Sequence, residues 1–364
     1  MDDGAGRAGL DRDPARTPRR RGRRSRYHHP PREREPGDPH FAGATYAALD
    51  LGTNNCRLLV ARPTRDSFRV VDAFSRIIRL GEGVGASGRL SEAAIDRAVD
   101  ALAVCRGKMQ NRGVTRARLI ATEACRAAEN GQDFLARVHD EVGIALEIVD
   151  RETEARLAAT GCTPLIDPQA RGVILFDIGG GSSELVLLDQ SAALRSGGPP
   201  QPEIRAWVSL PVGVVTLAER HGGIEVDHAK YESMVGEVAR FVDPFVAANG
   251  GAIDGLHLLG TSGTVTTIAG VHLNLPRYER RWVDGCWMSD QQVTQVVDRL
   301  LAMSYRDRAA NPCIGPERAD LVLAGCAILE AIRRAFPCER LRVADRGLRE
   351  GMLVQMMRED GVWR

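Results

Sequence analysis

A hairpin pattern that occurs twice is the feature that most constrains the fold of this chain. Each copy runs from a strand-like apolar segment through a turn of small residues into a second strand-like segment. The matching positions are Asp50, Gly52 and Leu58 in the first copy and, 127 residues later, Asp177, Gly179 and Leu185 in the second. A repeat of this length predicts two domains of similar topology, because solenoid repeats have periods of only about 20–50 residues.

The segments around both hairpins predict an α/β fold. A third extended run follows each hairpin, at residues 68–80 and 203–213, and helical segments come after it. Strands that alternate with helices indicate sheets with helices on their faces, and 364 residues are enough for two domains. We therefore expect a first domain over residues 44–168 and a second over residues 169–364, whose last helix packs back on the first.

Residues 1–43 differ in composition and are expected to form a disordered, Arg-rich tail. Residues 1–40 hold eleven Arg, seven Asp or Glu and few large apolar groups, so they cannot bury enough surface to become ordered. The cluster at residues 19–26 can attract polyanions by counterion release, but no aromatic residue interleaves its arginines for base stacking. A solvated extension, or a start assigned too far upstream, is the expected interpretation, and nucleic acid is not an expected partner.

The cysteines and the apolar segments indicate the cellular compartment in which the protein is expected to act. The eight cysteines never form a C-x-x-C pair, so we expect reduced, mostly buried side chains rather than a zinc site or a disulfide framework. No apolar run approaches the ~18–20 residues of a membrane span, and the N-terminus lacks the apolar core of a secretory signal. These observations predict a cytoplasmic protein with no membrane partner.

The composition of the two turns indicates a phosphate site. The backbone of a Gly- and Ser-rich turn can approach a ligand closely and point N–H groups at phosphate oxygens. Asp50 and Asp177, which end the first strand of each hairpin, repel anions unless a divalent cation or a positioned water lies between, so both are predicted Mg²⁺ ligands. The alternative, a long hairpin with a bulge and no ligand, is disfavoured because the pattern occurs twice. The predicted phosphate-binding residues are Gly52, Thr53, Asn54 and Asn55 in the first turn and Gly179, Gly180, Gly181, Ser182 and Ser183 in the second.

Several motifs give the chain a resemblance to a known family. The two turns and a third Gly-rich motif at residues 258–270 resemble the actin, sugar-kinase and chaperone-ATPase superfamily. Within it the chain resembles the exopolyphosphatase and guanosine pentaphosphate phosphatase (Ppx/GppA) family, from about Tyr46 to Leu353. The motifs that carry this resemblance are ATEACRAAENG, RETEARLA, FDIGGGSSELVL, PERADLVLAG and ADRGLREGML. The third motif adds to the predicted phosphate site Gly260, Thr261, Ser262 and Gly263.

The resemblance implies two ribonuclease H-like domains of the actin-like ATPase fold, with a cleft between them. One departure concerns the first turn, which reads Gly-Thr-Asn-Asn where the family usually reads Gly-Ser-Asn-Ser. Asn55 therefore places an amide where a hydroxyl is usual, and the donor set of this turn differs from the family pattern.

Glutamates and arginines near strand ends are the predicted catalytic groups. Glu123 directly follows the strand-like segment 118–122, at the end where open α/β sheets bind ligands. By resemblance, glutamates of the ATEACR and RETEAR motifs orient or deprotonate the attacking water. We rank Glu123 first and Glu152 second, with Glu154 in reserve, because residues two apart on a helix face different sides. The predicted phosphate-binding arginines are Arg57, Arg79 and Arg126. The first two are equally compatible with structural ion pairs.

The function implied by the resemblance is hydrolysis of terminal phosphoanhydride bonds. The substrate and partner would be inorganic polyphosphate, guanosine pentaphosphate or both, with Mg²⁺ as cofactor and a homodimer as the assembly. The sequence contains neither a Walker-type phosphate loop nor a G-x-S-x-G elbow. Two alternatives stay open: a kinase or ATPase of the same superfamily, which needs an acceptor-site Asp base instead of the motif glutamates, and a non-catalytic polyanion-binding regulator.

Overall fold

The computed structural model describes residues 43–191, 203–250 and 255–363. They belong to a compact unit that begins at Gly37, and the predicted tail, apart from its last residue, lies outside the described residues. Among the helices described, none is long and apolar enough to cross a bilayer.

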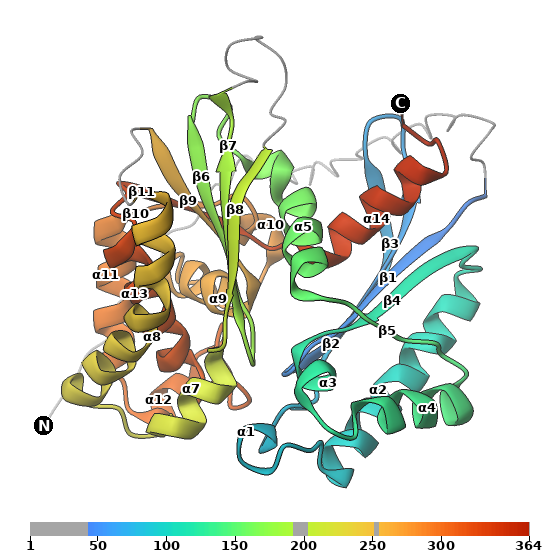
Figure 1. Ribbon diagram of the computed structural model, residues 1–364, viewed down its shortest axis with the longest axis horizontal. Helices are drawn as coiled ribbons and strands as arrows, with labels where there is room; N and C mark the ends of the chain where they lie inside the picture. Colours follow the sequence, from blue (N-terminus) through green and yellow to red (C-terminus); the bar gives the residue numbers. More distant parts are fainter. Residues whose placement is uncertain (1–42, 192–202, 251–254, 364) are drawn as a thin grey trace, which may run out of the picture. The chain divides into compact units, whose positions relative to one another are not determined.

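The first half of the chain forms a five-stranded sheet (Figure 1). Its strand order is β3-β2-β1-β4-β5, with β1 antiparallel to β2 and parallel to β4. The strands are β1 (Tyr46–Leu51), β2 (Asn55–Pro63), β3 (Phe68–Ile77), β4 (Arg116–Ala121) and β5 (Glu147–Ile148). The helices are α1 (Val84–Ser87), α2 (Glu92–Asn111), α3 (Glu123–Ala127), α4 (Gly131–Val142), α5 (Arg151–Cys162) and the short 3-10 helix η2 (Thr163–Leu165).

The second half forms a six-stranded sheet of order β10-β11-β9-β6-β7-β8. The strands are β6 (Gly172–Ile178), β7 (Ser183–Asp189), β8 (Glu203–Leu210), β9 (Leu256–Thr261), β10 (Trp287–Ser289) and β11 (Arg340–Ala344). The helices are α7 (Val214–His221), α8 (His228–Asn249), α9 (Ser262–His272), α10 (Arg280–Val283), α11 (Asp290–Ala302), α12 (Tyr305–Ala310), α13 (Val322–Ala335) and α14 (Leu348–Glu359). Without β10, the order β8-β7-β6-β9-β11 repeats that of the first sheet. The prediction of two ribonuclease H-like α/β domains is confirmed.

Local sequence signals place the helices that carry the site. Ser91 caps α2 by accepting a hydrogen bond from the backbone N–H of Ala94, and Asp150 caps α5 by accepting one from Thr153 at 2.7 Å. Gly143 ends α4 with a φ of 67°, a left-handed conformation that glycine adopts without steric cost. These caps fix where each helix leaves its strand.

Alternating side chains of β1 build two cores on the first sheet. Ala47, Leu49 and Leu51 pack in one cluster with α2 and α4, whereas Tyr46 and Ala48 pack in another with α14. This alternation follows from the two-residue period of a strand. In the second sheet, one face packs against α8, α9, α11 and α13, and the other against α5.

Helices α5 and α14 pack against each other between the two sheets (Figure 1). A Cβ atom on Gly161 of α5 would lie 2.0 Å from the carbonyl oxygen of Gly347, and one on Gly351 of α14 would lie 1.9 Å from that of Leu157. The two backbones therefore touch, which only glycine permits. Each of these helices covers the sheet built by the other half of the chain.

Candidate active site

Both matched hairpins end at one cavity of about 120 Å³. The hairpin turns have the same geometry, because the N–H of Gly52 donates to the carbonyl of Asn55 at 2.9 Å and that of Gly179 donates to the carbonyl of Ser182 at 2.9 Å. The residues that line the cavity from the first hairpin are Asp50, Gly52, Thr53, Asn54, Asn55 and Arg57. Those from the second hairpin are Asp177, Gly179, Gly180, Gly181, Ser182 and Glu184.

The two turns lie in direct contact. A Cβ atom on Gly180 would lie 2.9 Å from Cβ of Thr53, and one on Gly181 would lie 3.0 Å from the Thr53 hydroxyl oxygen. The same Gly181 position lies 3.1 Å from Cγ of Glu123. The absence of side chains at these glycines thus allows both turns and a predicted catalytic glutamate to meet at one point.

The third Gly-rich motif contributes only part of its predicted set. Ser262 and Gly263 line the cavity, and Thr261 lines only an adjoining one. Gly260 packs under the ring of Phe176, where a Cβ atom would lie 2.5 Å from a ring carbon. Ser262 has a φ of 87°, and its hydroxyl donates to a carbonyl at the end of β6 at 2.7 Å. The motif therefore joins α9 to the second turn.

An arginine joins two glutamates at the edge of the cavity. Arg126 Nε donates to Glu123 Oε2 at 3.0 Å, and Arg126 Nη2 lies 3.3 Å from Glu154 Oε2. Arg151 donates to the other carboxylate oxygen of Glu123 at 2.9 Å. Both glutamates line the cavity, with side chains only 15% and 13% exposed. Burial, reinforced by the charge of Glu184, raises the pKa of Glu154 well above its ordinary value, so Glu154 accepts a proton more readily than an exposed glutamate does.

Glu152 does not face the cavity. Its side chain is 47% exposed and accepts a hydrogen bond from Arg156, one helical turn later, at 2.7 Å. Residues two apart on an α-helix differ by roughly 200° in direction, and in α5 it is Glu154 that points inward. This corrects the expected order, in which Glu152 preceded Glu154.

Five buried or half-buried carboxyl groups line the same cavity: Asp50, Glu123, Glu154, Asp177 and Glu184. Burial and the charge of Asp50 raise the pKa of Asp177 to about 6, against the opposing charge of Arg57. Burial and the charge of Asp177 raise the pKa of Glu184 to about 7, although two serine hydroxyls donate to it at 2.8 and 2.9 Å. Within the described ranges, no group of three His, Cys, Asp or Glu side chains is close enough to hold a metal ion by itself. The cavity therefore concentrates negative charge that a cation would stabilise.

Three arginines that face this region form no ion pair with any described residue. Arg57 and Arg318 line the first cavity and, with Arg349, line the adjoining one. In the part of the chain that the structure describes, none of the three guanidinium groups has a hydrogen-bond or ion-pair partner. Burial and the charge of Arg57 lower the pKa of Arg318, and burial lowers that of Arg349. A cluster of unpaired arginines is typical of a site for a polyvalent anion.

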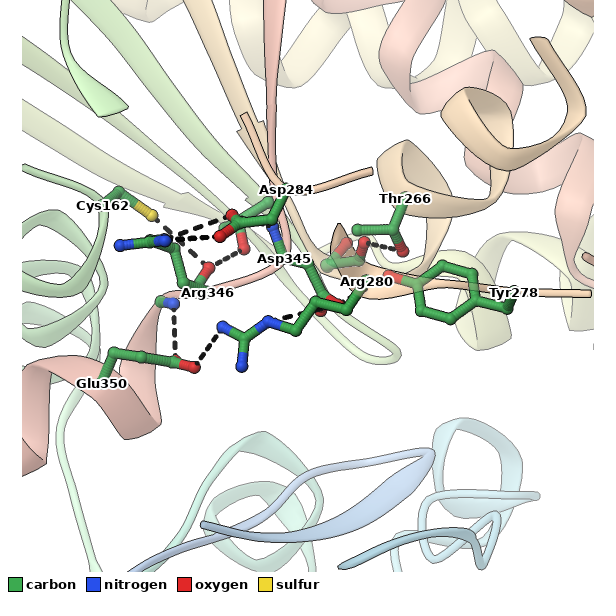
Figure 2. A network of polar contacts seen from close by, with 11 residues as sticks. Cys162, Thr266, Tyr278, Arg280, Asp284, Asp345, Arg346 and Glu350 are labelled. Atoms are coloured by element: carbon green, nitrogen blue, oxygen red, sulfur yellow. Dashed lines mark hydrogen bonds and ion pairs between the residues drawn. The ribbon is translucent and has the colours of Figure 1, made fainter. Parts of the chain in front are cut away.

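The adjoining cavity has a volume of about 510 Å³. It shares with the first cavity Asp50, Arg57, Asp177, Ser262, Gly263, Arg318 and Leu348. Figure 2 shows the polar network that orders its wall at the start of α14. The pairs are Arg280 with Glu350 at 3.0 Å, Tyr278 with Asp345 at 2.7 Å, and Arg346 with Asp284. The two cavities thus adjoin each other, and the larger one is lined by five arginines as well as by acidic groups.

Besides Gly260, three predicted phosphate-binding residues line neither cavity. Arg79 forms an ion pair with Asp320 at 3.0 Å. Arg126 instead contacts Glu123 and Glu154. The Ser183 hydroxyl is fully buried and donates to the carbonyl of Val212 at 2.7 Å. These side chains support the site without facing it.

Sequence reasoning missed several groups at the site. Glu184 occupies the repeat position of Arg57, since β1 pairs Asp50 with Arg57 and β6 pairs Asp177 with Glu184 in the same register. The 127-residue offset could have identified it. Arg318 and Arg349 lie within two motifs noted in the sequence, PERADLVLAG and ADRGLREGML. Only the structure shows that neither guanidinium group is bonded to a described residue.

Comparison with known proteins finds a matching family and several relatives of this chain. The model of the Ppx/GppA phosphatase family matches residues 59–360. The guanosine-5'-triphosphate,3'-diphosphate pyrophosphatase of Aeromonas hydrophila is 28% identical over 313 residues, which cover 86% of this chain and 59% of that protein. Exopolyphosphatase 2 of Mycobacterium tuberculosis is 28% identical over 331 residues, 85% of this chain and 98% of that protein. The chain therefore spans less than two thirds of the length of the Aeromonas enzyme.

A solved structure supports the same relationship. The crystal structure of the Aquifex aeolicus member of the Ppx/GppA protein family matches with a TM-score of 0.70 and 29% identity. The match covers 87% of this chain and 98% of that one. An exopolyphosphatase from Cytophaga hutchinsonii, with a TM-score of 0.77 and 24% identity over 86% and 98% of the two chains, shares the fold.

Proposed function

Because this chain belongs to the Ppx/GppA phosphatase family, we propose that it hydrolyses terminal phosphoanhydride bonds of inorganic polyphosphate, of guanosine pentaphosphate, or of both. The observation that carries the proposal is the contact of two matched Gly-rich turns beside Glu123 and Glu154. Backbone N–H groups of such turns suit phosphate oxygens. The two glutamates line the same cavity, which favours them as the groups that act on the attacking water.

Water activation falls to the two glutamates that Arg126 joins. In the proposed mechanism Glu154 accepts a proton from the attacking water, because its burial favours the protonated form. Glu123, fixed by Arg126 and Arg151, orients that water through its remaining lone pairs. The turns hold the terminal phosphate in line, so that the bond to the next phosphate breaks as water adds.

The oxygen-rich set of donors in the cavity fits a hydrated Mg²⁺ ion. Asp50 and Asp177 supply carboxylates, and the side-chain oxygens of Asn54 and Asn55 are buried without a hydrogen-bond partner among the described residues. Mg²⁺ takes one or two carboxylates and keeps several waters, and such waters could donate to the two amides. When bound, the cation would screen the phosphate charge from the carboxylates and stabilise charge on the leaving group. We propose Asp50 and Asp177 as the residues that hold it.

The second cavity supports a substrate longer than one phosphate. Arg318 and Arg349 line it and form no hydrogen bond or ion pair through their side chains with any described residue. Arginine side chains match phosphate oxygens bidentately. We propose that the terminal phosphate lies at the turns and the rest of the anion extends past these arginines. A polyphosphate chain and a guanosine nucleotide both have this shape and charge, so both are proposed substrates.

The cellular setting belongs to the same proposal. We propose that the protein acts in the cytoplasm and that it forms a homodimer. Light scattering on the purified full-length chain would test the dimer, and a mass equal to one chain of 39.6 kDa would contradict it.

A side-by-side assay tests the proposed function. Phosphate release is measured from long-chain polyphosphate, from guanosine pentaphosphate and from ATP, each with Mg²⁺ and with EDTA. We expect Mg²⁺-dependent release from at least one of the first two substrates and much less from ATP. Release only from ATP would favour an ATPase or kinase, and tight binding without release would favour a polyanion-binding regulator.

A further inference from the structure

Arg79 was expected to bind phosphate or to form a structural ion pair, and its surroundings support a more specific role. We propose that the Arg79–Asp320 ion pair is a latch between the two domains, and that Arg79 is a positioning residue that holds Arg318 opposite Arg57 for the substrate. This inference rests on the proposed function, since it names a residue that sets the affinity of the site for its anionic substrate.

The backbone at Arg79 is bonded to the first turn. The N–H groups of Ile78 and Arg79 both donate to the carbonyl of Asn54, at 2.9 and 3.1 Å, and the N–H of Gly81 donates to the carbonyl of Thr53 at 2.9 Å. Arg79 adopts a φ of 47°, a left-handed conformation that is uncommon outside glycine. The segment after β3 is therefore bonded directly to the first turn.

The side chain of Arg79 reaches the other domain. Its Nη2 donates to Asp320 Oδ1 at 3.0 Å and to the carbonyl of Glu317 at 3.1 Å. These two acceptors lie on either side of Arg318 in the chain. A second contact lies close by in sequence, since the N–H of Gly83 donates to Glu219 of α7 at 2.9 Å. One short segment of the first domain is thus attached at two places to the second.

The latched segment carries a cation, Arg318, that faces a like charge on Arg57. Arg318 shares both cavities with Arg57, and among the described residues neither guanidinium has a bonded partner. Without an anion, the repulsion between two like charges favours a conformation in which Arg318 turns away from Arg57. Hydrogen bonds from Arg79 on both sides of Arg318 oppose that displacement, so the site is preorganised before substrate arrives.

The exposure of the pair separates this role from a purely structural one. The side chains of Arg79 and Asp320 are 31% and 23% exposed, and pairs of this kind add little to folding stability. Removing the latch is therefore expected to leave Tm within about 2 °C of wild type. The loss falls on substrate affinity, because Arg318 must then be brought into place by the substrate itself.

The test compares single, double and charge-reversed variants of the full chain. Arg79→Gln and Asp320→Asn should each raise KM about tenfold while kcat stays within about twofold. The charge reversal Arg79→Asp with Asp320→Arg should restore KM to within about threefold of wild type, whereas Arg79→Asp alone should not. Arg220→Gln is the matched control, because Arg220 and Glu237, 43% and 22% exposed, join α7 to α8 within one domain; its KM should not change.

Double variants show whether Arg79 acts through Arg318. Combining Arg79→Gln with Arg318→Gln should raise KM no further than Arg318→Gln alone, because the latch has nothing left to position. Additive effects, a failed charge reversal, or a KM for Arg79→Gln within twofold of wild type would each overturn the proposal.

Binding of inorganic tripolyphosphate, measured by titration calorimetry, separates this proposal from the proposed function. If wild type hydrolyses neither polyphosphate nor guanosine pentaphosphate, the proposed function is wrong. The dissociation constants of the same variants for tripolyphosphate then still test whether the Arg79–Asp320 pair sets the affinity for an anion. We expect Kd to rise about tenfold in Arg79→Gln and in Asp320→Asn, and to return to within about threefold of wild type in the charge reversal. Equal Kd values for wild type and Arg79→Gln would reject the latch whether or not the protein is an enzyme.

Discussion

Two glutamates on one turn of α5 allow a controlled test of the proposed general base. Glu154→Gln replaces the inward carboxylate by an amide of the same shape, and Glu152→Gln makes the same chemical change on the exposed side, 47% against 13% exposed. We expect the first to abolish most turnover and the second to leave it unchanged. Arg126 keeps its bonds to Glu123 in both variants, so the cavity should keep its shape.

The magnitude follows from the role of each group. Loss of a general base costs roughly 10²–10⁴-fold in rate, which is about 3–5 kcal/mol at 1.36 kcal/mol per decade. Glu152→Gln removes only an exposed pair with Arg156, worth about 0.3–0.5 kcal/mol of folding stability. Glu154→Gln should not lower stability at pH 8, because burial disfavours the charge that the variant removes. Glu154→Gln is thus expected to lose activity without losing stability, and Glu152→Gln to lose a little stability without losing activity.

Initial rates of phosphate release across pH 5–9, with urea unfolding of each variant, measure both effects. In wild type kcat/KM should rise with pH through an ionisation above the ordinary value for glutamate, because Glu154 must lose its proton to act. That limb of the profile should disappear in Glu154→Gln. A loss of less than tenfold in kcat for Glu154→Gln, or an equal loss for Glu152→Gln, would refute the assignment.

Three further predictions concern the carboxylates and glycines of the cavity. Folding raises the pKa of Glu184 from 4.5 to about 7, so its protonation stabilises the fold fully below pH 4.5, and this stabilisation is lost as pH rises through 7. At pH 8 without metal, Glu184→Gln should therefore have a free energy of unfolding up to about 3 kcal/mol higher than wild type. Equal urea midpoints of the two proteins would contradict this. EDTA should abolish phosphate release and added Mg²⁺ should restore it. Asp50→Asn or Asp177→Asn should need at least a tenfold higher Mg²⁺ concentration for the same rate. Full phosphate release in EDTA would contradict the proposed role of Mg²⁺. Gly180→Ala puts a Cβ atom 2.9 Å from Thr53 of the first turn and should raise KM at least tenfold. The control Gly107→Ala, which has open space around it, should leave KM unchanged. Similar KM values for both variants in a coupled phosphate assay would argue against contact between the two turns.

The two-domain fold could be predicted because its signals are local and repeated. The period-two apolar segments, the small-residue turns and the 127-residue offset all lie in the sequence, and the strand pairings Asp50–Arg57 and Asp177–Glu184 preserve that offset in space. The family motifs supplied the remaining topology. The opposite charges at the two equivalent positions, Arg57 and Glu184, were visible in the repeat but acquire meaning only when both turns are seen to share one cavity.

The parts of the site that could not be predicted depend on direction and on distant partners. Glu152 and Glu154 have the same chemistry, and the orientation of α5 alone decides which one faces the cavity. The partner of Arg79 lies 241 residues away, a distance at which no local pattern operates. The free arginines at the larger cavity, such as Arg349, differ from paired ones only in what surrounds them in three dimensions.

The exchange of helices between the two halves bears on how the chain can be divided. A fragment ending near residue 168 would lack α14 and so leave bare the apolar face of the first sheet that includes Tyr46, Ala48 and Ile120. A fragment beginning there would lack α5 and leave bare the face of the second sheet that includes Val173. Neither half can become a stable protein alone, so the sheets are expected to melt in one cooperative transition, and any genetic fusion or split must keep both helices in the same molecule.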